Sequence, residues 1–267
     1  MEESPIVHSQ NILYGTLDKI PLYLDVYAPA SPPKEPMKVA VYFHGGGWFA
    51  GDKAGYGGTT WVPFFAAHGY ISVSVNYRLS GTSIFPAQIV DCQLAIRWLR
   101  AHATTYHLDP NRIAVWGHSA GGHLALLATT AGDFQFGHES DELNEFPSRV
   151  QAAVSVAGPT DLLQMGGWHN APDSPEARLL GGPIHDRADL AKLANPITYL
   201  SANTPPILLI HGDRDETVPV NQSLLFYEQL VNGSIYRVKD MDHGLNSNQV
   251  SEADLLRIIL TFFDRHF

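Results

Sequence analysis

The feature of the sequence that most constrains the fold is a regular alternation of β-rich apolar runs with helical segments after residue 37. Residues 70–78 alternate Ile71, Val73 and Val75 with polar side chains, which is typical of a strand. Residues 86–103 instead carry apolar side chains at helical spacing behind a leading proline, which is typical of a helix. This alternation predicts an α/β fold in which helices cover both faces of a mostly parallel sheet.

The expected sheet has eight strands. The first two strands form an antiparallel pair around a turn at Asp18 and Lys19, and the strands after residue 37 alternate with helices. The predicted strands are residues 11–17, 20–29, 38–46, 70–78, 112–117, 150–158, 205–213 and 234–240. The predicted helices are residues 86–103, 120–130 and 220–232, together with a C-terminal helix.

The length of 267 residues and a hydrophobic content of 45% fit a single domain over residues 1–267. One interval breaks the alternation, because residues 159–204 separate two strands and contain little more than a short helical piece. Connections of this length in compact domains usually carry function. We therefore expect residues 159–204 to form a small lid or pocket wall.

The charge and cysteine content limit the partners. The net charge is −10, and the 17 basic residues form no cluster, so neither nucleic acid nor a membrane surface is expected as a partner. The N-terminal residues resemble no signal peptide, and no apolar run is long enough to span a bilayer. A single cysteine, Cys92, suits a reducing compartment, so a cytoplasmic protein is expected. Whether the chain forms a homo-oligomer stays open.

Ser119 is the candidate nucleophile. It lies in Gly117-His118-Ser119-Ala120-Gly121-Gly122, where a predicted strand meets a predicted helix. A nucleophile at a sharp strand-to-helix turn needs small neighbours, and the helix N-terminus offers free N–H groups to a developing negative charge. Sheets of this kind bind ligands at the carboxyl ends of their strands, which is where Ser119 is expected.

A serine hydroxyl needs a base, and that base needs an acid to orient it. His243 follows the last predicted strand and is the expected base. Asp213 and Asp215 both follow the preceding strand; Asp215 lies further into the loop and is the favoured acid, whereas Asp213 suits a structural role. Asp240 and Asp242 are weaker candidates. His44, His118, His123 and His211 are expected to be structural, and no histidine spacing indicates a metal site.

The glycine run after the strand at 38–46 supplies candidate oxyanion donors. Glycines expose backbone N–H groups without side chains in the way, and such donors stabilise a tetrahedral intermediate. The expected donors are Gly46, Gly47 and Ala120, with Gly45 as the substitute if the loop is shifted by one residue. Large aromatic side chains could line the substrate pocket, and the candidates are Trp48, Phe49 and Trp168.

Taken together, these motifs resemble the α/β-hydrolase esterases. The chain is similar to the hormone-sensitive-lipase group and closer to the compact bacterial feruloyl and acetyl-xylan esterases. The matching residues are His44-Gly45-Gly46-Gly47-Trp48, Gly51-Asp52, Tyr77-Arg78-Leu79, Phe85-Pro86-Ala87 with Asp91, Asp109-Pro110 with Arg112, residues 117–122, His211-Gly212 with Asp215 and Val218-Pro219, and Asp242-His243-Gly244. The resemblance implies an α/β-hydrolase fold with Ser119, Asp215 and His243 as a triad. In contrast to the larger lipase-like members, no long N-terminal helical cap is expected from these residues.

The function expected from these features is a serine carboxylesterase that acts on a small-molecule, short-acyl ester without a cofactor. Two alternatives stay open. One is an amide hydrolase, either arylformamidase-like or a small peptidase. The other is a non-catalytic binding protein with a hydrolase fold.

Overall fold

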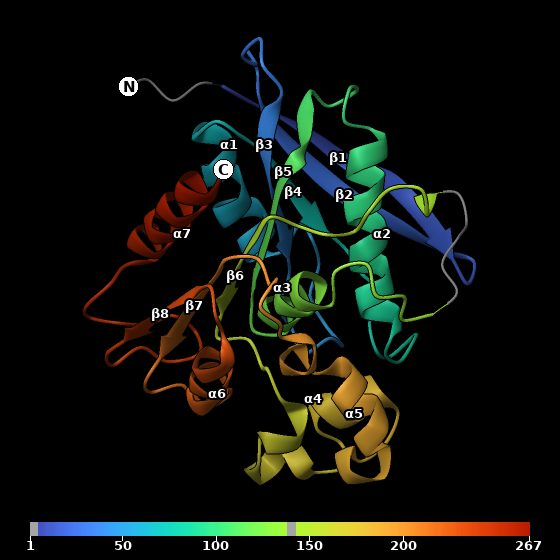
Figure 1. Ribbon diagram of the computed structural model, residues 1–267, viewed down its shortest axis with the longest axis vertical. Coiled ribbons are helices and arrows are strands. Elements are labelled where there is room, and N and C mark those ends of the chain that lie inside the picture. Colours follow the sequence, from blue (N-terminus) through green and yellow to red (C-terminus); the bar gives the residue numbers. More distant parts are fainter. Residues whose placement is uncertain (1–4, 138–142) are drawn as a thin grey trace.

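The computed structural model describes residues 5–137 and 143–267, which form one eight-stranded sheet with helices around it (Figure 1). Residues 1–4 and 138–142, which the predicted domain includes, lie outside the described residues. The strand order is β1-β2-β4-β3-β5-β6-β7-β8. The strands are β1 (Ile6–Leu17), β2 (Ile20–Pro29), β3 (Met37–Phe43), β4 (Tyr70–Val75), β5 (Leu108–His118), β6 (Ala152–Val156), β7 (Ile207–Gly212) and β8 (Gly233–Val238).

The sheet is mostly parallel, as the sequence predicts. Strand β2 pairs antiparallel with both β1 and β4, and every other neighbouring pair is parallel. Strands β3 and β5 are buried along nearly their whole apolar stretches. Fully buried strands read as continuous apolar runs because both faces are covered. Because the central strands are parallel, their carboxyl ends meet at one edge of the sheet. The candidate residues that follow β3, β5, β7 and β8 lie at this edge.

Helices cover both faces of the sheet (Figure 1). On one face, α1 and α7 pack over a cluster that includes Phe65, Trp116 and Phe263. On the other face, α2, α3 and α6 pack over a larger cluster that includes Leu99, Leu124 and Phe226. The helices are α1 (Val62–Ala67), α2 (Ala87–Ala101), α3 (Ala120–Ala131), α4 (Pro175–Leu180), α5 (Ala188–Ala194), α6 (Asn221–Gln229) and α7 (Glu252–His266).

The interval 159–204 contains more regular structure than the sequence predicts. It folds into α4, α5 and several short 3₁₀ turns, which gather at one end of the molecule, at the bottom of Figure 1. The expected helical piece near residue 190 corresponds to α5, whereas α1 and α4 are helices that the periodicity did not predict. Six-residue helices are too short to give a periodic signal. In the two described ranges no helix combines the length and the apolar character needed to cross a membrane.

Candidate active site

Ser119 lies between β5 and α3, at the turn the sequence predicts. Its backbone has φ 57° and ψ −122°, a conformation that non-glycine residues seldom adopt. The Ser119 amide donates to the Val156 carbonyl at 2.8 Å, and the His123 amide donates to the Ser119 carbonyl at 3.0 Å. The end of β6 and the first turn of α3 therefore hold this strained residue in place.

The small residues around Ser119 are required by close backbone contacts. A Cβ on Gly121 would collide with the carbonyl oxygen of Phe43 at the end of β3. A Cβ on Gly117 would collide with that same oxygen and with the backbone of Gly121. Glycine at both positions lets α3 start directly against the ends of β3 and β5, which places Ser119 at the sheet edge.

His243 and Asp215 complete a hydrogen-bonded chain with Ser119. The Ser119 hydroxyl lies 3.0 Å from His243 Nε2. His243 Nδ1 donates to Asp215 Oδ2 at 2.7 Å. Since Nδ1 carries the proton, Nε2 is left as the acceptor for the hydroxyl, which is the arrangement that a general base needs.

Two loops bring the acid and the base together. Asp215 Oδ1 accepts from the amides of Thr217 and Val218 at 2.9 and 2.7 Å, which fixes the carboxylate. The Arg214 amide donates to the Met241 carbonyl at 3.1 Å and so joins the loop after β7 to the loop that carries His243.

The other candidate acids lie elsewhere. Asp213 Oδ1 accepts from the Asp240 amide at 2.7 Å, which is the structural role expected of it. Asp240 pairs with Arg214 at 2.7 Å, and Asp242 accepts from the Asn246 amide at 2.9 Å.

The electrostatics favour an ionised Asp215. Burial alone would raise the pKa of this carboxyl, but hydrogen bonds with His211 and His243 and from the Val218 amide outweigh it and hold the pKa well below its usual range. A permanent negative charge beside Nδ1 stabilises the imidazolium that forms when His243 takes a proton.

The glycine loop after β3 folds back beside Ser119. The amides of Phe49 and Ala50 both donate to the Gly46 carbonyl, at 3.2 and 3.0 Å. Gly46, Gly47 and Ala120 all line the same cavity as Ser119 and His243. Their role as oxyanion donors stays a prediction.

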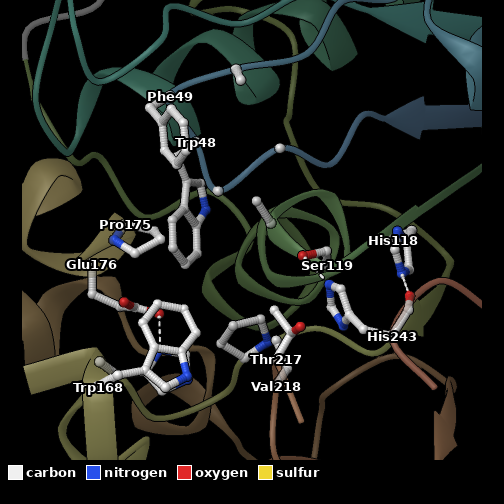
Figure 2. Close-up of a pocket in the computed structure, with 16 residues that line it drawn as sticks. Trp48, Phe49, His118, Ser119, Trp168, Pro175, Glu176, Thr217, Val218 and His243 are labelled. Carbon is white, nitrogen blue, oxygen red and sulfur yellow. Dashed lines mark hydrogen bonds and ion pairs between the residues drawn. The ribbon is translucent and has the colours of Figure 1, made fainter. Parts of the chain in front are cut away.

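The cavity beside Ser119 has a volume of about 350 Å³ and is lined largely by apolar surface (Figure 2). The three predicted pocket residues all line it, in different ways. Trp48 is buried and donates from its indole to His123 Nδ1 at 3.1 Å, whereas Phe49 and Trp168 are exposed. Pro159, Pro175, Thr217 and Val218 complete much of the wall.

The remaining histidines are hydrogen-bonded, as expected. His44 bonds the Gly45 carbonyl at 2.8 Å, and its ring stacks on Tyr77. His123 Nε2 donates to the Ala194 carbonyl at 2.8 Å, and His211 bonds Ser223 and the Val218 carbonyl. His118 Nε2 donates to the backbone carbonyl of His243 at 2.9 Å. Across residues 5–137 and 143–267, no group of three histidine, cysteine or acidic side chains is placed to hold a metal ion.

Comparison with known proteins identifies the family. The BD-FAE family model matches residues 24–230, which is most of the chain. The chain belongs to the BD-FAE family.

Several relatives of this BD-FAE chain are named esterases. Esterase LipC of Mycobacterium tuberculosis (strain ATCC 25618 / H37Rv) is 34% identical over 233 residues, covering 84% of this chain and 55% of LipC. The chain thus spans about half the length of that relative.

Solved structures share the fold. A bifunctional GH43-CE protein of Bacteroides eggerthii superimposes with a TM-score of 0.85 at 34% identity, covering 97% of this chain and 38% of the other. A truncated carbohydrate esterase from gut microbiota superimposes with a TM-score of 0.86 at 26% identity, covering 100% of this chain and 98% of the other. These matches confirm the predicted α/β-hydrolase fold and the predicted esterase resemblance.

Two residues of this BD-FAE site carry no sequence signal. His169 and Glu176 line the cavity, with His169 Nδ1 2.8 Å from Glu176 Oε1. The sequence flags residues 159–204 as a pocket wall, but His169 lies in a 3₁₀ turn and Glu176 in the separate helix α4, so no single period relates the two. Only the fold of this segment brings the two side chains together.

Proposed function

We propose that this protein is a serine carboxylesterase that hydrolyses small, short-acyl esters. The observation that carries the proposal is the continuous chain from Ser119 through His243 to Asp215, with distances of 3.0 and 2.7 Å, beside an apolar cavity. A serine, a base and an orienting acid in this geometry are the parts that acyl transfer requires.

In the acylation half-reaction, Ser119 Oγ attacks the ester carbonyl carbon while His243 Nε2 takes the hydroxyl proton. The carbonyl oxygen becomes negative and accepts from the amides of Gly46, Gly47 and Ala120, each donor being worth about 3 kcal/mol of transition-state stabilisation. The intermediate collapses when the ester C–O bond breaks, and His243 returns the proton to the leaving alkoxide. An acyl-Ser119 ester and a free alcohol result.

In the second half-reaction, water replaces the alcohol. His243 takes a proton from water, the resulting hydroxide attacks the acyl carbon, and the same three amides hold the oxyanion. Collapse breaks the bond to Ser119 Oγ, which regains its proton from His243. The products are a carboxylic acid and the starting enzyme, so the cycle needs no cofactor.

The size of the substrate follows from the cavity. A volume of about 350 Å³ is near the lower end of the range typical of ligand pockets. Trp48, Pro175 and Val218 close it with apolar surface that suits a short acyl chain. A panel of p-nitrophenyl esters of increasing acyl length should therefore show a sharp fall in kcat/KM beyond short chains, and a preference for long chains would contradict this assignment.

The nucleophile has a direct test. We expect Ser119→Ala to lower kcat on p-nitrophenyl acetate by a factor on the order of 10⁴ to 10⁶, because no other group can form the acyl-enzyme. A fluorophosphonate probe should label the wild-type protein at Ser119 and leave the variant unlabelled. Full activity in the purified variant would rule out this mechanism, and an unlabelled wild type would favour a binding protein instead.

Ester rather than amide substrates are favoured because the relatives compared above are named esterases. Rates on a matched ester and anilide pair distinguish the two activities. A cytoplasmic location is part of the proposal and is supported by the single, buried Cys92. Residues 159–204 act as the pocket wall of one domain, a role supported by the place of Pro159, Trp168 and Pro175 in the cavity lining.

A further inference from the structure

A second polar group faces the catalytic residues across the cavity. Figure 2 shows Ser119 and His243 on one side of the space and Trp168, Pro175 and Glu176 on the other. Glu176 belongs to the first turn of α4 and is one of the residues that line the cavity. Most of the lining between these two sides is apolar. The cavity therefore has polar groups on two opposite sides, and the proposed mechanism uses only those of Ser119 and His243.

The second polar group is the buried pair of Glu176 and His169, which has unused hydrogen-bonding capacity. The exposed fractions of Glu176 and His169 are 2% and 3%. Their mutual bond occupies Glu176 Oε1 and His169 Nδ1 at 2.8 Å. Among the described residues, neither Glu176 Oε2 nor His169 Nε2 has a hydrogen-bond partner. Leaving a buried polar atom unpaired is unfavourable, and leaving a charged one unpaired is more so.

A structural ion pair alone does not account for these two free atoms. A pair that served only to join the turn at His169 to α4 would be expected to satisfy its buried oxygens and nitrogens internally. Here the free atoms belong to residues that line the substrate cavity. A ligand group that completes both atoms gives the pair a role in binding.

The chemistry of the free atoms defines that ligand group. Glu176 Oε2 only accepts hydrogen bonds, so its partner must donate. His169 Nε2 accepts when the ring is neutral and donates when it is protonated. A hydroxyl group satisfies the carboxylate as a donor and can meet the ring nitrogen in either state. A purely apolar acyl or alcohol group would leave both atoms unpaired.

A cationic substrate fits the same wall less well. One aromatic ring of the lining, Phe49, already has a cation over it, because the Arg178 guanidinium lies 4.9 Å from the ring centroid. A second positive charge there would be repelled. The wall therefore suits a neutral donor group better than an ammonium group.

Trp168 lies against the His169 ring of the pair. Its indole stacks on the His169 ring with centroids 3.8 Å apart, and half of its surface is exposed. Gly166 and Gly167 precede it with φ of 70° and 55°, and a Cβ at either position would meet open space. Because Trp168 stacks on His169 and is half exposed, we expect that rotation of this one side chain would expose the His169 ring to the cavity.

We propose that Glu176 and His169 form a specificity site for a free hydroxyl group carried by the ester substrate. The proposal rests on the esterase function above and deepens it: the preferred substrate is a hydroxylated ester, with the hydroxyl on either its acyl or its alcohol part. Glu176 accepts a hydrogen bond from the hydroxyl, and His169 holds the carboxylate in place and contacts the same hydroxyl or a neighbouring one.

Two pairs of esters that differ by a single hydroxyl test the proposal. The acyl pair is p-nitrophenyl butyrate and p-nitrophenyl 3-hydroxybutyrate, and the alcohol pair is cyclohexyl acetate and trans-2-hydroxycyclohexyl acetate. The wild-type enzyme should prefer the hydroxylated member of one pair in kcat/KM by about 10-fold or more, as expected for a hydrogen bond to a charged group. The pair that shows the preference identifies the part of the substrate that reaches Glu176.

Each variant is compared by the ratio of kcat/KM for the hydroxylated ester to that for its partner without the hydroxyl. A partly inactive preparation does not change this ratio. Glu176→Gln keeps the shape but removes the charge, and it should lower the preference about 10-fold. His169→Phe should lower it as well and serves if Glu176→Gln does not fold. Glu228→Gln, an exposed glutamate on α6, is the matched control and should keep the wild-type ratio.

Two results would overturn the proposal: a wild-type enzyme without preference in either pair, or variants of Glu176 and His169 that keep the wild-type ratio. Either would assign the pair to structure, with its free atoms bonded to water. Failure of the esterase function is a different outcome, in which none of the four esters is hydrolysed and a fluorophosphonate leaves Ser119 unlabelled.

Discussion

His118 joins the residue before the nucleophile to the backbone of the base. Its Nε2 donates to the His243 carbonyl at 2.9 Å, and the two rings lie 4.8 Å apart. Burial, together with the nearby His243, lowers the pKa of His118 to about 4, so the ring is neutral near pH 7. A neutral ring that donates from Nε2 positions the His243 loop without adding a charge beside the base. We infer that His118 is a positioning residue.

Loss of this bond should slow the reaction and leave binding intact. We expect His118→Phe to lower kcat on p-nitrophenyl acetate about 10-fold to 100-fold with little change in KM, because a displacement of the base by about 1 Å costs that much. His118→Gln should recover most of the rate, since its amide can donate to the same carbonyl. Steady-state kinetics and thermal melting of both variants make the comparison. A phenylalanine variant with the wild-type kcat would remove His118 from the mechanism.

At this scale the sequence predicts residues whose position in the chain implies their position in space. Ser119, Asp215 and His243 each follow a strand of a mostly parallel sheet, so the fold brings them to the same edge, and the distances of 3.0 and 2.7 Å fit that expectation. Glu176 and His169 follow no strand. Their contact depends on how a short 3₁₀ turn packs against α4, which no periodic pattern encodes.

The contact between α3 and β3 is the element-scale feature that places the nucleophile. Gly121 lies in the first turn of α3, directly over the carbonyls of Phe43 and His44 at the end of β3. A side chain at residue 121 would meet backbone atoms, which cannot rotate aside. The helix would have to move away from the sheet and take Ser119 and the Ala120 amide with it.

Gly121→Ala should therefore reduce both stability and activity. We expect the free energy of unfolding to fall by about 1–3 kcal/mol, the usual cost of overpacking, and kcat to fall with it. Urea denaturation and p-nitrophenyl acetate kinetics measure the two effects. Gly81→Ala is the matched control, since Gly81 is exposed and a Cβ there meets nothing within 4 Å. Equal unfolding free energies for the two variants would show that the contact can relax.

Element boundaries show where sequence patterns stop being informative. Strand β5 begins at Leu108, four residues before the predicted start, because Leu108 pairs with Met37 across an irregularity in the ladder. Helix α4 was not predicted although its signals are present. Ser174 caps it, Pro175 occupies its first turn and Gly181 ends it in a left-handed conformation. Capping residues at both ends do not predict a helix when the segment between them is too short to show a periodic apolar pattern.

Across the whole molecule, buried histidines join the elements that surround the site. His123 accepts from Trp48 in the glycine loop and donates to the Ala194 carbonyl at the end of α5, so it connects the glycine loop, α3 and the pocket wall. Burial lowers its pKa from 6.5 to about 4, and the bond to Ala194 only partly offsets this. His118 behaves in the same way, and burial also lowers the pKa of His44. The folded protein thus holds these rings neutral.

This arrangement gives the stability a defined pH dependence. Between pH 6.5 and 4 the unfolded chain binds protons that the folded protein excludes. The contribution of each neutral ring to the free energy of unfolding is therefore intact above pH 6.5 and is lost as the pH falls towards 4. Asp91 acts in the opposite direction, because burial raises its pKa from 3.8 to about 6 and its folded form takes up a proton first. The slope of the whole molecule is the sum of both effects, and a variant is needed to isolate one ring.

His123→Gln isolates the ring that joins the glycine loop to α5. Between pH 7.5 and 4.5 we expect the unfolding free energy of the wild type to fall by about 2–3 kcal/mol more than that of the variant, the difference being one excluded proton. The variant is expected to be less stable at pH 7.5, since an amide fits the two bonds of the ring less well, so the test compares slopes. Urea denaturation at several pH values gives them, with exposed His185→Gln as the control. Parallel curves for the wild type and His123→Gln would mean that His123 takes up its proton in the folded state, which requires water to reach the junction of the glycine loop, α3 and α5.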